Sequence, residues 1–143
     1  MTDLSFNVNR MNMAIDVARN KLARVYSKRI APIISFMNIH GYSYDHTTVL
    51  ILTELFDREV YPTEKLCELF GAENLHNAKI VNKVLQGNLD NEVIPEVAKR
   101  VLICIVQQQL TQHLLGQCQH FDQTRWLTKD ECLVLISHLD SGG

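Results

Sequence analysis

The apolar residues of this chain recur with the spacing of an α-helix, and this periodicity limits the fold more than any other feature. In the first segment they follow a 4-3-4-3 spacing, at Met11, Ile15, Ala18, Leu22 and Val25, which places them on one stripe of a helix. No run alternates apolar and polar residues for long enough to form a half-buried strand, and no Asn-Gly or Asp-Gly pair marks a hairpin. The sequence therefore predicts an all-α fold.

Helix start and stop signals divide the chain into six or seven helices joined by short connections. The expected helices span residues 9–29, 32–39, 46–56, 64–70, 75–86 and 92–115, and a last helix follows Thr128. Thr128 and Glu131 have the spacing of a capping box, with Leu127 and Cys132 at the positions of a hydrophobic staple. We expect one domain over residues 1–143, with N-terminal helices at 1–39, a central unit at 46–87 and C-terminal helices at 92–139.

The longest unbroken apolar run, from Val101 to Val106, lies within the expected helix 92–115 and is apolar on all sides. Such a helix must be covered on most sides, either by its own domain or by a second subunit. The run is far shorter than the ~20 residues of a membrane span. Asp3, Asn7 and Arg10 interrupt any N-terminal apolar segment of the kind found in signal peptides. We therefore expect a cytoplasmic protein without a membrane partner.

The basic residues are unevenly distributed along a chain whose formal net charge is -2. Six of the 14 basic residues lie in the first 29 positions, where only Asp3 and Asp16 oppose them. Lys21, Arg24 and Lys28 cluster on one face of the expected first helix. Such a face either contacts phosphates or forms a solvated flank beside a dimer interface.

Metal binding is not expected, although the chain contains six histidines and four cysteines. No Cys-x-x-Cys pair occurs, and the cysteines are expected to be reduced and mostly buried. The only local cluster of possible ligands is His113, Cys118 and His120, at and after the end of the helix 92–115. A structural zinc site normally needs two close pairs of ligands, so we expect an ordinary helix end here.

No arrangement of residues in the sequence is typical of a catalytic site. The acidic pairs Glu64/Glu68 and Asp130/Glu131 lie at expected helix starts, where the helix dipole favours negative charge. The glycines are scattered and mostly mark helix ends, so no phosphate-binding loop is present. We expect no enzymatic activity, no catalytic residue and no cofactor.

Residues 63–86 have the pattern of two helices joined by a tight turn that contains a glycine. Cys67 is small enough for the crossing point of a helix-turn-helix, and Gly71 stands four residues later, at the start of the turn. Thr63 is the expected N-cap of the first helix and Asn74 of the second. The turn is therefore expected to comprise residues 71–74.

The second helix of this pair has one apolar side, formed by Leu75, Ala78, Val81 and Leu85. The opposite side carries His76, Lys79 and Lys83, flanked by Asn77 and Asn82. Asparagine amides can read adenine edges and lysine can reach guanine or phosphate, so these residue types suit the major groove of DNA. The alternative interpretation is an αα-hairpin whose outer face is simply solvated.

Three segments carry a resemblance to a known family: Thr-Thr-Val-Leu-Ile-Leu-Thr-Glu-Leu at 47–55, Pro-Thr-Glu-Lys-Leu-Cys-Glu-Leu-Phe-Gly at 62–71, and Asn-Leu-His-Asn-Ala-Lys-Ile-Val-Asn-Lys-Val-Leu at 74–85. In sequence and in the order of its elements, the chain resembles the MarR-type winged-helix regulators. The resemblance implies DNA binding, with residues 75–86 as the recognition helix. The chain departs from the family after Gly87, where residues 88–92 are acidic and too short for a two-stranded wing.

The same resemblance implies a homodimer joined through the terminal helices. The candidate interface residues lie on the first and last helices and are Met11, Ile15, Leu22, Leu133 and Ile136.

Two functional hypotheses follow from these features. The first is a non-enzymatic transcriptional regulator that binds double-stranded DNA as a homodimer. Its candidate DNA contacts are His76, Asn77, Lys79, Asn82 and Lys83. Lys21, Arg24 and Lys28 are expected to add contacts to the DNA backbone. The second is a small helical protein–protein interaction module, an adaptor or an inhibitor, without DNA binding. It is motivated by the apolar run 101–106 and by the apolar stripe of the first helix.

Overall fold

The chain is helical throughout the part that the structure describes. The structure is a computed structural model that describes residues 4–88, 93–115 and 127–141. The helices are α1 (Leu4–Lys21), α2 (Ala23–Val25), the π-helix η1 (Tyr26–Ile30), α3 (Ala31–Ile39), α4 (Tyr44–Asp57), α5 (Thr63–Phe70), α6 (Ala72–Leu85), α7 (Glu96–Leu114) and α8 (Lys129–Ser141). No strand occurs among these residues, so the all-α prediction is confirmed. None of the described helices is long and apolar enough to cross a lipid bilayer.

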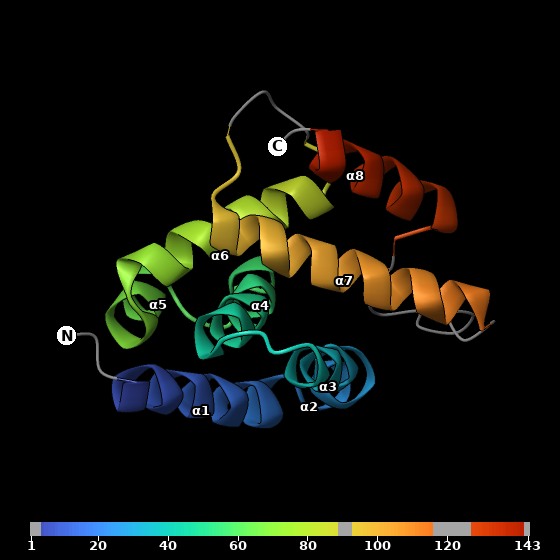
Figure 1. Cartoon of the computed structure of the whole chain (residues 1–143). Helices are drawn as coiled ribbons and strands as arrows, with labels where there is room; N and C mark the ends of the chain where they lie inside the picture. Colours follow the sequence, from blue (N-terminus) through green and yellow to red (C-terminus); the bar gives the residue numbers. More distant parts are fainter. Residues whose placement is uncertain (1–3, 89–92, 116–126, 142–143) are drawn as a thin grey trace.

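Helix α4 lies at the centre of the fold (Figure 1). It packs against α1 on one side, against α6 on the opposite side, and also against α7. All residues from His46 to Leu55 are buried. Two of the buried hydroxyls bond within the helix: Thr48 donates to the carbonyl of Tyr44 (3.0 Å) and Thr53 to that of Val49 (2.8 Å). The third, of Thr47, donates to Sδ of Met37 in α3 (3.6 Å). These internal bonds allow α4 to be enclosed by apolar neighbours.

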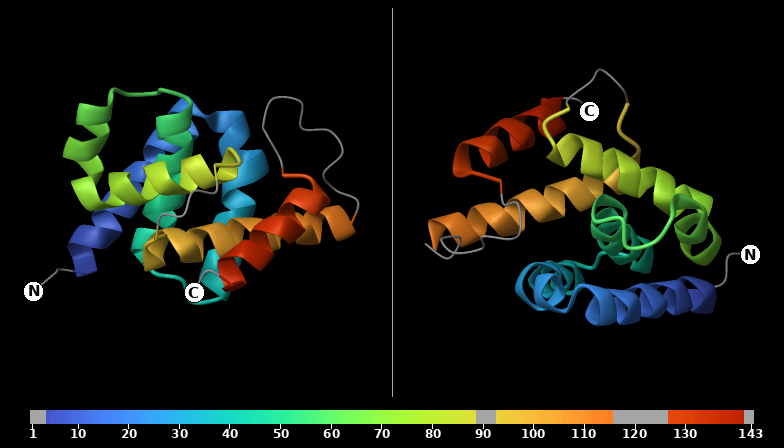
Figure 2. Two further views of the ribbon diagram at one scale, coloured as in Figure 1. Left: turned by 90° about the horizontal axis from the view of Figure 1, so that it is seen from above. Right: turned by 180° about the vertical axis from the view of Figure 1, so that it is seen from behind.

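Helix α7 packs against α3, α4 and α6 and carries α8 on its outer side (Figure 2). Of the six residues in the apolar run 101–106, only Ile103 is not fully buried. A single chain therefore covers this run, and no second subunit is needed to do so. The helix begins at Glu96 with Pro95 as its N-cap, rather than at residue 92 as expected.

The N-terminal helical segment is divided, whereas the sequence predicted one continuous helix over residues 9–29. Helix α1 ends at Lys21, and Leu22 has non-helical angles (φ −131°, ψ 40°) before α2 begins. The chain then widens into η1, where the N–H of Ala31 bonds to the carbonyl of Tyr26, five residues earlier. Pro32 has no N–H, and its ring crowds the carbonyl four residues before it, which explains the widened turn immediately upstream.

A single residue, Gly71, joins α5 to α6, so the prediction of a turn over residues 71–74 is wrong. Gly71 has φ 95° and ψ 146°, a backbone region that other residues rarely adopt, and the chain changes direction within this one residue. Asn74 lies inside α6 instead of capping it, and its Nδ2 donates to the carbonyl of Phe70 (2.9 Å) at the end of α5. The N-cap of α5 is Pro62 rather than Thr63.

The start of α8 has the predicted capping box. The N–H of Thr128 donates to Oε1 of Glu131 (2.8 Å), and the N–H of Glu131 donates to Oγ1 of Thr128 (3.1 Å). Leu127 and Cys132, the two staple residues, are both buried. In addition, Oε1 of the buried Gln109 accepts a hydrogen bond from the N–H of Leu127 (2.9 Å), which ties the start of α8 to α7.

Candidate nucleic-acid interface

Three basic side chains share the outward face of α6. His76 and Lys79 are exposed and Lys83 is half-buried. Their i, i+3, i+7 spacing places them on one stripe of the helix. The opposite side of α6 is buried against α4 and α7. We call His76, Lys79 and Lys83 the α6 basic stripe.

The position of Lys79 is supported by an aromatic ring. Its Nζ lies 5.7 Å from the ring centroid of Phe56, near the C-terminal end of α4, within the range of a cation–π contact. The only carboxylate in α6 is Glu73, in the first turn, where the helix dipole favours negative charge. The stripe is therefore basic over the remainder of the helix.

Asn77 does not belong to this face, and the prediction that it flanks the lysines is wrong. It is only 4% exposed, and its Nδ2 donates to the carbonyl of Glu73 (3.1 Å). Helix α6 packs on both α4 and α7, so its buried side is broad enough to include position 77. Asn77 is therefore not placed to reach a base edge.

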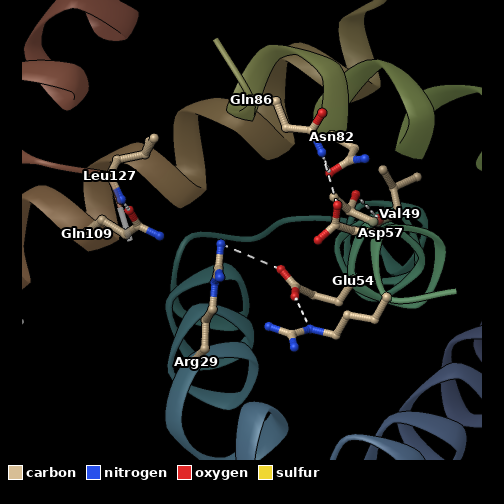
Figure 3. A network of polar contacts seen from close by, with 10 residues as sticks. Arg29, Val49, Glu54, Asp57, Asn82, Gln86, Gln109 and Leu127 are labelled. Atoms are coloured by element: carbon tan, nitrogen blue, oxygen red, sulfur yellow. Dashed lines mark hydrogen bonds and ion pairs between the residues drawn. The ribbon is translucent and has the colours of Figure 1, made fainter. Parts of the chain in front are cut away.

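Asn82 is half-buried and turned toward the end of α4 (Figure 3). Nε2 of Gln86 donates both to Oδ1 of Asn82 (3.4 Å) and to Oδ1 of Asp57 (3.0 Å). The Asn82 side chain is thus engaged in a contact between α4 and α6. Neither of the two asparagines expected at the interface presents a free amide on the outward face of the helix.

Lys21, Arg24 and Lys28 are exposed, as a phosphate-contacting role would require. They lie at the end of α1, in α2 and in η1, and Figures 1 and 2 place α1 and α6 on opposite sides of α4. These three residues therefore do not form one continuous surface with the α6 basic stripe.

A contact that the sequence did not predict joins α1 to the junction of α5 and α6. A Cβ added at Gly71 would lie 2.7 Å from Nη1 of Arg10, so the guanidinium group lies directly against the glycine backbone. Arg10 is half-buried in this position. The junction that orients α6 is thus supported from α1.

A buried ion-pair cluster lies between η1 and α4 (Figure 3). Glu54, only 7% exposed, has Oε2 3.6 Å from Nη2 of Arg29 and Oε1 3.2 Å from Nε of Arg58. Arg29 is also buried, whereas Arg58 is half-buried. In the sequence, Glu54 stands out as the one acidic residue in the long apolar stretch of α4. Its partner Arg29 is distant in sequence, and no sequence pattern indicated that it is buried.

His46 caps the N-terminus of α4. Its Nδ1 accepts a hydrogen bond from the N–H of Ser43 (3.0 Å), and the Ser43 hydroxyl lies 2.9 Å from the same nitrogen. The Tyr42 ring packs edge-on against the imidazole, with the ring centroids 5.2 Å apart. Burial lowers the pKa of His46, and the positive charge of Arg100 lowers it further.

The described residues provide no metal centre. No group of three potential ligands lies together in this part of the chain. His113 contacts the carbonyl of Leu127 through Nε2 (2.6 Å), while Cys118 and His120 lie outside the described residues. Burial raises the pKa of Cys104 to about 12, so its thiol is uncharged at neutral pH.

The residues predicted for a dimer interface differ in their exposure. Ile15, Leu22 and Ile136 are half-buried and pack against the core of their own chain. Met11 is half-buried. Leu133 is 48% exposed on α8, next to Val134, which is 59% exposed. Of the predicted residues, Leu133 therefore has the most surface available to a partner.

An apolar groove runs between the C-terminal end of α6 and α8. It encloses about 240 Å³ and is lined mainly by Val84, Leu85, Leu127, Val134 and Leu135. Its rim carries two carboxylates, Asp130 and Glu131. The groove was not expected from the sequence, because it depends on how α8 is placed beside α6.

No known protein family, no curated protein and no solved structure matches this chain.

Proposed function

We propose that this protein is a non-enzymatic DNA-binding protein and that the α6 basic stripe is its contact surface. The observation that supports the proposal is the alignment of His76, Lys79 and Lys83 on the outward face of a helix whose other side is buried. At 1.5 Å of rise per residue, the stripe extends over roughly 10 Å, enough to contact several phosphates.

The contacts that α6 offers favour the phosphate backbone over the bases. Asn77 is buried and Asn82 bonds to Gln86, so the amides that would read adenine are not directed outward. Lysine contacts with phosphates position a protein on DNA but carry no sequence information. We therefore expect binding with little sequence preference and a strong dependence on salt.

The test is duplex binding by the wild type and by the variant Lys79→Glu/Lys83→Glu. We expect the variant to lose at least about tenfold in affinity at low salt. The slope of log K against log salt concentration should fall by about two, since two phosphate contacts are removed. Unchanged binding by a variant with native helicity would contradict the proposal.

Two control variants separate charge at the stripe from general effects. Lys79→Arg/Lys83→Arg keeps both charges and should bind like the wild type. Lys129→Glu reverses an exposed charge on a different helix, at the start of α8, and should have little effect.

We further propose that the protein is a homodimer, joined through α8. The supporting observation is the pair of exposed apolar side chains Leu133 and Val134, beside the apolar groove. The molecular mass in solution should be that of two chains, and Leu133→Lys/Val134→Lys should give a monomer. A wild-type monomer would remove the dimer from the proposal.

The second candidate function is a protein–protein interaction module, favoured by the same apolar groove. In that case the groove takes an apolar side chain of another protein, and the carboxylates Asp130 and Glu131 at its rim favour a partner with basic residues. A monomeric wild type that has no affinity for DNA would support this candidate over the DNA-binding protein.

A further inference from the structure

The longest part of the chain without a carboxylate lies between Asp16 and Asp45. It contains five lysine and arginine residues, of which Arg29 is buried beside Glu54. The other four are exposed: Arg19, Lys21, Arg24 and Lys28. We call these four residues the basic corner. They lie at the end of α1 and in the two short helices that follow it, α2 and η1.

Several contacts hold the basic corner in place. The Arg19 guanidinium lies 5.5 Å from the ring centroid of Tyr26, which links the end of α1 to η1. The Ser27 hydroxyl donates to the carbonyl of Arg24 (3.3 Å). Arg29 and Ile30, at the end of η1, are buried and anchor the segment to the core. The exposed cations are therefore carried by an ordered, helical support.

The basic corner has no acidic partner among the residues that the structure describes. The ion pairs found among the described residues join Glu54 to Arg29 and Arg58 and Glu96 to Arg100, and none includes Lys21, Arg24 or Lys28. Their charges are consequently available to an anionic ligand. The exposed uncharged residues between them, Asn20, Ala23 and Ser27, are small or polar, whereas Leu22, Val25 and Tyr26 are half-buried against the core. The surface therefore offers cations without a large, fully exposed apolar group that could enter a lipid layer. A surface of this kind fits the phosphate backbone of a nucleic acid.

The basic corner and the α6 basic stripe are on opposite sides of α4 (Figures 1 and 2). A straight duplex that lies along α6 therefore leaves the corner free. We infer that the corner is a second DNA-binding surface and that the protein bridges two duplexes. The inference rests on the proposed function, because it assigns the first duplex to the α6 basic stripe.

The experiment is a capture assay with one duplex fixed to beads and a second, fluorescent duplex in solution. Wild-type protein should bind to the bead-bound duplex and retain the fluorescent one. Lys21→Gln/Arg24→Gln/Lys28→Gln should still bind the bead-bound duplex but should retain at least tenfold less of the fluorescent one. Lys79→Gln/Lys83→Gln should bind the bead-bound duplex more weakly, through the corner alone, and should also retain at least tenfold less of the fluorescent one. The combination of both sets should not bind the beads.

The possible outcomes distinguish this inference from the proposed function. If the wild type binds the beads but captures no second duplex, bridging is wrong and DNA binding through α6 stands. If the corner variant still captures the second duplex, two α6 stripes of a dimer suffice, and the corner surface is wrong. If the wild type does not bind the beads at all, the proposed function fails and the inference fails with it.

A parallel experiment with lipid vesicles tests whether the basic corner binds lipid headgroups instead of DNA. Wild-type protein and the corner variant are sedimented with phosphatidylserine vesicles in parallel with the capture assay. Binding to vesicles that the corner variant loses, together with no capture of a second duplex, would replace DNA by an anionic membrane as the corner's ligand and overturn the inference.

Discussion

At the scale of single residues, two buried ionisable side chains determine how the helices around them begin and pack. His46 occupies the position where a capping box usually has glutamate or glutamine, and it accepts the N–H of Ser43 through Nδ1. Glu54 lies between two arginines in the most enclosed helix of the fold. Both arrangements depend on a particular charge state, so both can be tested by mutation.

The cap at His46 should make the stability of the protein depend on pH. A protonated imidazole carries a hydrogen on Nδ1 and cannot accept the Ser43 N–H. Because folding lowers the pKa of His46 below its ordinary 6.5, the unfolded chain binds more protons in the window just below that value. The free energy of unfolding should therefore fall as the pH decreases below about 6.5, as measured by urea denaturation between pH 5 and pH 8.

His46→Gln and His46→Ala are the matched variants for this prediction. Glutamine can accept the same N–H without titrating, so His46→Gln should lose less stability between pH 7 and pH 5 than the wild type does. His46→Ala removes the side-chain acceptor and should be destabilised by about 1 kcal/mol at pH 8. An equal pH dependence in the wild type and His46→Gln would show that this cap is not the titrating group.

Removal of the Glu54 carboxylate should be far more costly than removal of Arg58. Glu54→Ala takes away the charge that neutralises the buried Arg29, which should cost about 3–5 kcal/mol. Arg58→Ala removes only the half-buried partner, and the loss should be about 1 kcal/mol or less. Denaturant unfolding of the two variants measures this difference. Equal losses in the free energy of unfolding would mean that the ion pair between Glu54 and Arg29 does not stabilise the fold.

At the scale of helices, the sequence predicted the elements whose signals are local. The capping box at Thr128 and Glu131 requires only residues three positions apart, and it is present in the structure. The break at Leu22 and the single-residue junction at Gly71 were missed, because no local sequence signal marks Leu22 as a break and the positive φ of Gly71 is not encoded by its neighbours.

In the candidate site, too, features with a local sequence signal were predicted and features that depend on packing between helices were not. The outward position of His76 and Lys79 followed from helical periodicity. The burial of Asn77 did not, because it depends on α6 packing against two helices at once. The bond from Gln86 to Asp57 and the ion pair between Glu54 and Arg29 could not be predicted either, because their members lie 29 and 25 residues apart in sequence.

The junction at Gly71 should not tolerate a side chain. Gly71→Ala would place a Cβ at φ 95°, where an L-residue is strained, and 2.7 Å from Nη1 of Arg10. We expect a loss of about 1–3 kcal/mol in the free energy of unfolding. Gly41→Ala is the matched control, because Gly41 also has a positive φ but no atom within 4 Å of the added Cβ. The double variant Gly71→Ala/Arg10→Ala removes the contact between the new Cβ and Arg10, so the loss of stability that remains measures the backbone strain. A Gly71→Ala variant as stable as the wild type would contradict this description of the junction.

At the scale of the whole molecule, charge and packing are organised around α4. The basic corner and the α6 basic stripe lie on opposite sides of this helix, although the formal net charge of the chain is -2. Helix α8 is attached differently, since it packs mainly on α7. The molecule thus has an enclosed centre and a peripheral C-terminal helix.

The enclosure of α4 has a consequence for native-state hydrogen exchange. Solvent deuterium can reach the backbone amides between His46 and Leu55 only when helices on several sides separate, which amounts to opening the entire molecule. Protection factors at these amides should therefore equal the global stability measured with denaturant. The amides of α8 should exchange faster, through partial opening that leaves α4 protected, and equal rates in the two helices would show that the chain opens as one cooperative unit.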